Sequence, residues 1–196
     1  PIICFDTETT GVDAVVAEIV GMSFSYENHK AFYIPMPEEH DDATAILDEF
    51  RVVFENEAIE KIAQNIKYDY MILLRYDIEV KGKMFDTMLA HYLIEPDQRH
   101  NMDAMSENYL GYGPVSIETL IGKGAKQLSF RTVPIDKATE YAAEDADVTW
   151  QLKQILEKDK NFAPVKKVFD EVEIPLVSVL AHMEREGVRI DRAVLD

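Results

Sequence analysis

The amino-terminal segment, PIICFDTETTG, constrains the fold of this chain more than any other. Residues 2–5 form a continuous apolar run, which is typical of a central strand covered on both faces. Asp6 and Glu8 follow, with one threonine between them. Side chains two apart on a strand share a face, and their Cα atoms lie about 6.5–7 Å apart. The strand therefore directs two carboxylates into one space, where they repel each other unless a cation lies between them.

The rest of the chain predicts an α/β fold. Alternating residues predict a hairpin over 18–26 and 31–36, and we expect further short strands at 59–65 and near 79–85. Helical spacing predicts helices at 44–56, 68–76 and 86–94, a long helix opened by Pro134, and a second one from Pro164 to Glu186 that Gly187 closes. Strands first and helices later indicate a mixed sheet covered by helices.

Composition excludes several classes of protein. The single cysteine, Cys4, lies inside the first apolar run, so a disulfide framework is excluded. No apolar run approaches the length of a membrane span, and no signal peptide is visible, so we expect a cytoplasmic protein. The net charge of −17 argues against a chain that grips nucleic acid by itself. Such acidity fits a protein that binds divalent cations. It also fits a protein whose acidic residues only keep it soluble.

Two later segments carry further acids. Asp69, in QNIKYDYMILL, begins an apolar helical segment, where the helix dipole also favours an acid. In YAAEDADVT, Tyr141 and Asp145 are four residues apart and therefore neighbours on one helix face. Glu144 and Asp147 fall on other faces, where we expect them to meet solvent.

FDTET, QNIKYD and YAAEDAD, in this order and at these separations, resemble the three exonuclease motifs of the DEDD superfamily. The tyrosine four residues before the last aspartate marks the DEDDy branch. The similarity is closer still to the 3′–5′ proofreading exonuclease domain of bacterial, family A DNA polymerase I, and it extends to KMFDTMLAHYLI, RHNMD and GKGAKQLSF. EIPLVSVLAHMEREGVRID resembles the segment where the polymerase domain of that family begins.

The resemblance implies an RNase H-like α/β fold, with a mixed sheet of about five strands flanked by helices. It implies an exonuclease domain over 1–162, followed at 163–196 by a helix leading into a polymerase domain that this chain lacks. Pro1 and the ending after VLD lead us to expect a piece excised from a longer protein. The expected location is the bacterial cytoplasm, in association with the nucleoid.

The implied activity is metal-dependent 3′–5′ hydrolysis of phosphodiester bonds at the 3′ end of DNA, as proofreading for a polymerase. Asp6, Glu8 and Asp145 would hold one divalent cation. Asp6 would bridge to a second, with Asp69 helping through water, and Tyr141 would orient the attacking water. Both ions are expected to be Mg²⁺, which prefers oxygen ligands, with Mn²⁺ able to substitute. The expected partners are a single-stranded or frayed 3′ end and the polymerase domain of the same full-length chain.

The resemblance also implies substrate contacts, which we expect at Thr9, Gln64, Asn65, Tyr68 and, for a phosphate, Arg99. Val12 and Ile117 stand where relatives place a larger leucine and phenylalanine between the last bases. Lys123, Lys126 and Arg131 flank a glycine-rich loop, which either contacts phosphate or is simply solvated.

Two other functions stay open on the sequence. The chain could be a catalytically silent domain that binds DNA or scaffolds a polymerase, although it keeps all four acids and the tyrosine. It could also be an RNase D-like 3′–5′ exoribonuclease, because contacts to the 2′-hydroxyl, and not the catalytic residues, separate RNA from DNA. The polymerase-like carboxy-terminal segment favours DNA.

The acidity of the chain predicts weak binding to duplex DNA. Phosphate neutralisation by Lys and Arg supplies most non-specific affinity, so we expect a dissociation constant above about 1 µM at physiological salt. Fluorescence anisotropy with a labelled duplex measures it, and nanomolar binding would contradict the prediction.

Overall fold

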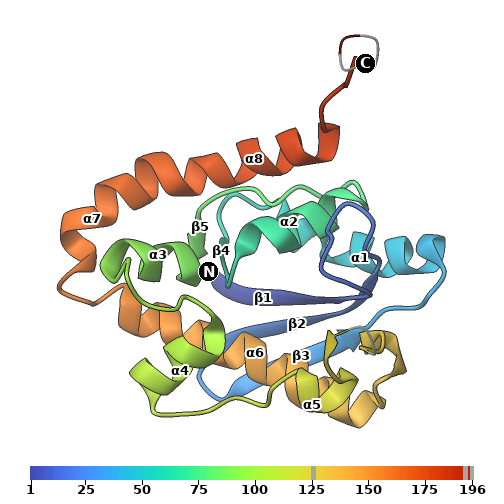
Figure 1. Cartoon of the computed structure of the whole chain (residues 1–196), viewed down its shortest axis with the longest axis horizontal. Helices are drawn as coiled ribbons and strands as arrows, with labels where there is room; N and C mark the ends of the chain where they lie inside the picture. Colours follow the sequence, from blue (N-terminus) through green and yellow to red (C-terminus); the bar gives the residue numbers. More distant parts are fainter. Residues whose placement is uncertain (125–126, 192–193, 195–196) are drawn as a thin grey trace.

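The computed structural model describes residues 1–124, 127–191 and 194, and its centre is a five-stranded sheet in the order β3-β2-β1-β4-β5 (Figure 1). The strands are β1 (Ile2–Thr9), β2 (Ile19–Glu27), β3 (Lys30–Pro35), β4 (Glu60–Ala63) and β5 (Met84–Asp86). β1, β2 and β3 pair antiparallel, whereas β4 runs parallel to β1 and β5 runs parallel to β4. The predicted mixed sheet is confirmed.

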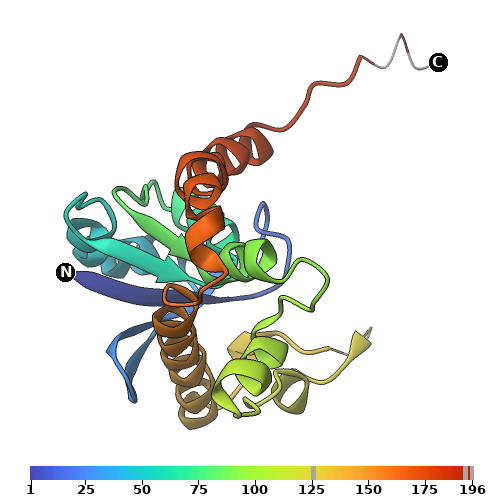
Figure 2. The ribbon, with the colours of Figure 1, turned by 90° about the vertical axis from the view of Figure 1, so that its left-hand side faces the viewer.

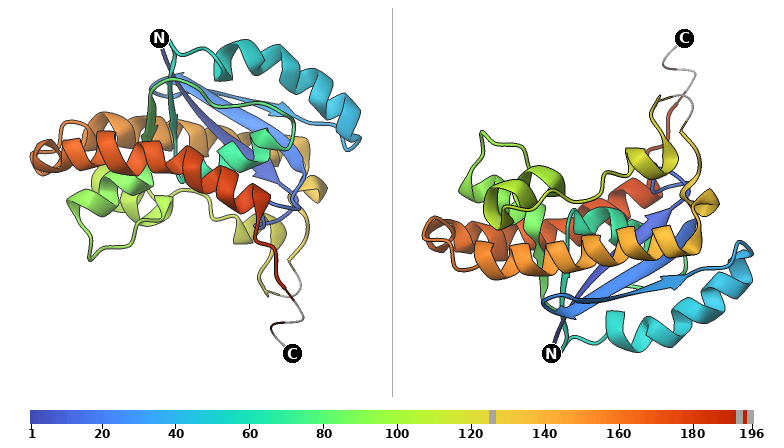
Figure 3. Two further views of the ribbon diagram at one scale, coloured as in Figure 1. Left: turned by 90° about the horizontal axis from the view of Figure 1, so that it is seen from above. Right: turned by 90° about the horizontal axis from the view of Figure 1, so that it is seen from below.

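Helices cover both faces of this sheet. They are α1 (His40–Phe54), α2 (Ile66–Leu74), α3 (Thr87–Ile94), α4 (Met102–Leu110), α5 (Glu118–Ile121), η2 (Phe130–Thr132), α6 (Ile135–Leu156), α7 (Phe162–Val168), η3 (Phe169–Glu173) and α8 (Ile174–Glu186). The long α6 crosses one face of the sheet, while α1 and α2 lie on the other (Figure 3). α8 packs over α2 (Figure 2). Among the described residues, no helix is both long and apolar enough to cross a bilayer.

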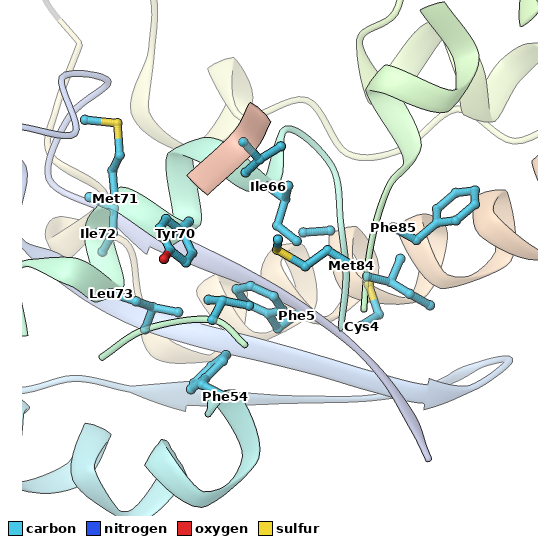
Figure 4. Close-up of a cluster of buried hydrophobic side chains, with 14 of the residues drawn as sticks. Cys4, Phe5, Phe54, Ile66, Tyr70, Met71, Ile72, Leu73, Met84 and Phe85 are labelled. Carbon is cyan, nitrogen blue, oxygen red and sulfur yellow. The ribbon is translucent and has the colours of Figure 1, made fainter. Parts of the chain in front are cut away.

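β1 is the central strand that its apolar run predicts. Cys4 and Phe5, which point to opposite faces, are both fully buried. The ring of Phe5 meets Phe54 of α1 edge-on, with centroids 5.0 Å apart (Figure 4). Because α1 covers one face and α6 the other, a residue's place in β1 decides which helix its side chain meets.

The predicted carboxy-terminal helix is present but not uniform. It forms α7 and α8, joined by the π-helical segment η3. Phe162 and Phe169 are buried against Phe85, with centroid distances of 5.8 and 5.0 Å. This helix therefore shares the core of the sheet domain, and the domain boundary at 162 stays a prediction.

Several boundaries differ from the predictions because of one buried side chain. Asp86 accepts hydrogen bonds from the backbone N–H groups of Asn65 and Ile66 and from those of Met88 and Leu89. It thereby fixes the turn at Asn65, whose φ is 62°, where β4 ends and α2 begins. The strand is shorter than 59–65, and the helix starts two residues before the predicted 68.

Replacing Asp86 by alanine would leave four backbone N–H groups, one buried and three half-buried, without their acceptor. We expect Asp86→Ala to lower the free energy of unfolding by about 2 kcal/mol. Urea denaturation at pH 7 in EDTA measures the change, with Asp97→Ala as the control because Asp97 is exposed. Equal stability of the two variants would contradict this role.

Candidate active site

Three carboxylates converge where β1 meets α6. One oxygen each of Asp6, Glu8 and Asp145 lie within 4.8 Å of one another, which makes these residues a candidate metal centre. Asp6 and Glu8 share the face of β1 that α6 covers, and Asp145 projects from α6. The structure thus brings together three of the four predicted acids from segments about 140 residues apart in the chain.

The donors of this cluster fit a hard divalent cation. Glu8 and Asp145 are each only 6% exposed. Within the described part of the chain, Glu8 Oε1 and Asp145 Oδ1 are buried and have no hydrogen-bond partner. Buried acceptor oxygens without donors are costly, and carboxylate oxygens are the ligands that Mg²⁺ and Mn²⁺ prefer.

The electrostatics of the cluster favour positive charge. Burial raises the pKa of the Asp6 carboxyl to about 6. Burial, followed by repulsion from Asp6, raises the pKa values of Glu8 and Asp145 well above their ordinary range. Each shift means that the charged form is disfavoured here, and a bound cation would remove that penalty.

Asp69 lies beside this cluster rather than in it. Pairing between β1 and β4 ends at Cys4 and Ile62, so Thr7 has no β4 neighbour. Asp69 Oδ1 instead accepts from the Thr7 backbone N–H at 2.9 Å and from its hydroxyl at 2.6 Å. Burial, and then repulsion from Asp6, raises the pKa of Asp69, so its carboxylate acts on the cluster electrostatically. The sequence carried no signal that singled out Thr7.

Tyr141 stands one helical turn before Asp145. Its ring packs against Phe130, with centroids 5.8 Å apart. Burial, repulsion from the charges of Asp145 and Glu8, and hydrogen bonding to Asp145 all raise the pKa of the Tyr141 phenol. The phenol is therefore a neutral group held at the rim of the cluster.

A cavity of about 590 Å³ opens beside Glu8. The first strand and its loop contribute Thr7, Glu8, Thr9, Thr10, Gly11 and Val12; the rest of the lining is Asn65, Tyr68, Ile117, Ile121, Gln127, Leu128, Ser129 and Phe130. Three of the predicted substrate contacts, Thr9, Asn65 and Tyr68, lie on its wall. Val12 and Ile117 also line it, and Val12 is 94% exposed.

Short polar contacts hold the strand-end loop against α2. The Tyr68 hydroxyl lies 2.5 Å from both the Thr9 hydroxyl and the Gly11 carbonyl oxygen. The Thr9 hydroxyl also donates to that carbonyl at 2.8 Å. Tyr68 and Thr9 therefore shape the cavity beside Val12 as well as lining it.

Gln64 and Arg99 lie elsewhere among the described residues. Gln64 donates from Nε2 to the His100 carbonyl oxygen at 2.8 Å and accepts from the Thr87 hydroxyl. Arg99 precedes His100 in an exposed loop. Neither belongs to the cavity lining that the structure describes, so their contacts with substrate stay predictions.

Arg131 is engaged within the fold, whereas Lys123 is largely exposed, which fits the solvated alternative. The Arg131 guanidinium donates to the carbonyl oxygens of Met36 and Ile19, at 3.2 and 2.8 Å, and so holds η2 on the sheet. Lys123 pairs with Glu118, and Lys126 lies outside the described residues.

Glu144 and Asp147, expected to meet solvent, are half-buried. Glu144 accepts from the Tyr112 hydroxyl and the Val115 N–H, and Asp147 accepts from the His29 N–H at 2.6 Å. Both acids therefore anchor neighbouring loops to α6.

A family model described as 3′–5′ exonuclease matches residues 1–160. The chain belongs to this 3′–5′ exonuclease family. Over 99% of its length it is 39% identical to DNA polymerase I of Pseudomonas aeruginosa and 36% identical to DNA polymerase I of Rhizobium leguminosarum. The predicted resemblance to the exonuclease domain of bacterial DNA polymerase I is confirmed. The chain spans 22% and 21% of those two relatives.

Solved structures confirm the RNase H-like exonuclease fold. NrnC of Brucella melitensis bound to pGG superposes with a TM-score of 0.69 at 19% identity, over 96% of this chain and 88% of NrnC. RNase D of Escherichia coli gives a TM-score of 0.66 at 15% identity, over 96% of this chain and 46% of that one. Pol1 of M. smegmatis gives a TM-score of 0.70 at 18% identity, over 96% of this chain and 29% of Pol1.

The raised pKa values predict how metal-free stability depends on pH. The folded chain holds protons on Asp6, Glu8, Asp69 and Asp145 more tightly than the unfolded chain does. The free energy of unfolding therefore falls as the pH rises from the ordinary carboxyl range, near 4, through about 6 and above. We expect a loss of about 2 kcal/mol between pH 5 and pH 8 in EDTA, measured by urea denaturation.

The double variant Glu8→Gln with Asp145→Asn tests whether these carboxyl groups cause the pH dependence, because it removes two of them. Its stability should depend less on pH than that of the wild type. A wild-type stability that rises over this range, or an unchanged slope in the double variant, would contradict the assignment.

Proposed function

We propose that this exonuclease domain is a two-metal 3′–5′ exodeoxyribonuclease that trims single-stranded or frayed 3′ ends of DNA and proofreads for a polymerase. The observation that carries the proposal is the cluster of Asp6, Glu8 and Asp145, whose oxygens lie within 4.8 Å beside an open cavity. Its unpartnered buried oxygens support a cation, and its family supports the reaction.

Asp6, Glu8 and Asp145 would hold one divalent ion, and Asp6 with Asp69 would hold a second. When bound, two such ions lower the pKa of a water molecule and stabilise charge on the leaving 3′ oxygen. Asp69 has one oxygen engaged by Thr7, which leaves the other for water or metal. Asp69 would therefore contribute to the second ion through a water molecule.

Tyr141 would orient the attacking water. A phenol with a raised pKa stays neutral, so it can donate or accept a hydrogen bond without competing for a cation. Its ring is fixed by Phe130, and its hydroxyl lies beside Asp145. Water held there would lie next to the cluster that activates it.

The cavity supports an unpaired terminal nucleotide as the substrate. Its wall combines exposed apolar side chains, Val12 and Leu128, with the polar groups of Asn65 and Thr9. Apolar groups can pack against bases of any sequence, and polar groups can bind sugar and phosphate. A paired terminus would have to unpair before it entered, which favours frayed ends.

The polymerase relatives favour DNA and a polymerase domain as the partner in the full-length chain. The net charge of −17 fits a partner of this kind. The Lys and Arg side chains that neutralise DNA phosphates would then come mainly from the polymerase domain. The retained acids speak against a silent scaffold, and the polymerase relatives speak against an RNase D-like enzyme.

A strand degradation assay tests the proposal. We expect a 5′-labelled single-stranded DNA to shorten from its 3′ end with Mg²⁺ or Mn²⁺, and faster than a blunt duplex or a matched RNA. Asp6→Ala should slow the reaction at least about 10³-fold, because metal stabilisation supplies several kcal/mol.

Asp147→Asn is the matched control, since Asp147 lies on the same helix outside the metal cluster. It should retain activity. Loss of activity in the control alone, or metal-independent shortening, would overturn the assignment, and faster digestion of RNA would favour the exoribonuclease.

Thermal unfolding tests the ions separately from the reaction. Saturating Mn²⁺, at about 100 times its dissociation constant, adds about 2.7 kcal/mol of stability, or roughly 5–10 °C in Tm. We expect this rise in the wild type and none in Asp6→Ala with Asp145→Ala. An equal rise in both proteins would mean that the ions bind elsewhere.

A further inference from the structure

The last helical segment of the chain, α7–η3–α8, is apolar on two faces. One face is buried on the domain through Phe169, Ile174, Val177 and Ala181. The other face carries five further apolar side chains that are 40–63% exposed, which we call the outer stripe: Val168, Val172, Leu176, Val179 and Met183. A helix on a protein surface needs only one apolar face, and a helix that is apolar all round is normally covered on every side.

The outer stripe is continuous along the helix. Its members follow each other at intervals of four, four, three and four residues, which keeps them on one side of the helix. At 1.5 Å per residue the stripe is about 22 Å long. Single exposed apolar residues, such as Val52 on α1, are ordinary on a protein surface. A contiguous apolar row is different, because it marks an interaction surface.

The helix that carries the stripe is firmly seated. The ring of His182 meets Tyr70 of α2 edge-on, with centroids 5.9 Å apart, and Lys67 of α2 pairs with Glu184. α8 thus packs along α2 at the outer edge of the molecule, as Figures 1 and 2 show. The exposure of the stripe therefore belongs to a fixed helix and not to a loose chain end.

The relatives indicate what covers the outer stripe. This chain spans only 22% and 21% of the two DNA polymerase I relatives, so most of each relative lies outside the matched part. The sequence of α8 resembles the start of the polymerase domain in that family. Apolar exposure also continues past the helix, at Val188 and Ile190. The stripe therefore lies next to the point from which a following domain would extend.

Charge argues against a second copy of this chain as the occupant. Each copy carries a net charge of −17, so two copies repel each other. A domain joined covalently to α8 needs little intrinsic affinity, because the link gives it a high effective concentration. Interfaces between domains of one chain are accordingly modest, at about 600–1,500 Å². A single helix face can contribute one side of such an interface.

We propose that the outer stripe is the surface on which the polymerase domain of the longer protein docks. The inference rests on the polymerase partner of the proposed function and names the surface that binds it. α2 connects this surface to the active site, because it packs against α8 and also carries Tyr68 and Asp69. A domain seated on the stripe is thereby held in a fixed position relative to the cavity that receives a 3′ end.

Thiol labelling measures whether the stripe is covered. Cys4 is fully buried, so a cysteine introduced at an exposed position is the accessible thiol of this chain. In the 196-residue chain, we expect Val179→Cys and Val172→Cys to react with iodoacetamide as fast as Val52→Cys. In the full-length protein both should react at least about 10-fold more slowly, because a covered thiol reacts only after local opening.

Val52→Cys is the matched control, since Val52 is an exposed valine on α1, outside the stripe. Its rate should be the same in both proteins. Mass spectrometry of each peptide separates the introduced thiol from any other cysteine of the full-length protein. Tm identifies a misfolded variant, and Val172→Cys decides the matter if Val179→Cys does not fold.

The outcomes separate this inference from the proposed function. Equal rates for Val179→Cys in the two proteins, or equal slowing of the Val52→Cys control, overturn the docking surface. Slowing that depends on the concentration of the 196-residue chain, with a dimer in sedimentation, also overturns it, because a second copy is then the occupant. A protected stripe in a full-length protein that leaves DNA uncut supports the surface and overturns the exonuclease reaction alone.

Discussion

Mutual repulsion among buried carboxylates is the constraint on which the rest of this structure depends. Asp6, Glu8 and Asp145 hold oxygens within 4.8 Å, in surroundings that raise all three pKa values. Such a cluster persists only where the surrounding fold is rigid enough to oppose it. The central position of β1 and the length of α6 provide that rigidity, because each is packed against the core on both sides of the site.

The sequence predicted the elements with strong local patterns and missed those that depend on distant contacts. β1, the hairpin and α6 follow from apolar runs and periodicity, and the acids followed from the motifs they resemble. α5 and η2 have only four and three residues, and α4 buries only Met105 and Ser106, so none of the three has a strong apolar pattern in the sequence. The contact of Asp69 with Thr7 and that of Arg131 with two carbonyls join residues more than 60 positions apart. Rules based on residue spacing apply only to residues near each other in the sequence, so they could not predict these contacts.

The fold alone does not choose the substrate. NrnC and RNase D share this architecture at 19% and 15% identity, and the second is described as an exoribonuclease involved in structured RNA processing. Function on a shared fold depends on the side chains around the site and on their contacts with the substrate. In this chain the cavity beside Glu8 is lined by the end of β1 and its loop, by Asn65 and Tyr68, and by described residues between 117 and 130.

The hydrogen bonds between Thr7 and Asp69 determine which substitution of Asp69 is informative. The Asp69 carboxylate takes the place of a missing strand neighbour, so it supports the backbone of the sheet in addition to its proposed role at the metal site. Alanine at this position would remove the proposed metal-site carboxylate and at the same time leave the buried Thr7 N–H without its acceptor. Asparagine keeps one acceptor oxygen for Thr7 and removes the charge, so it separates the structural role of Asp69 from its proposed role at the metal site.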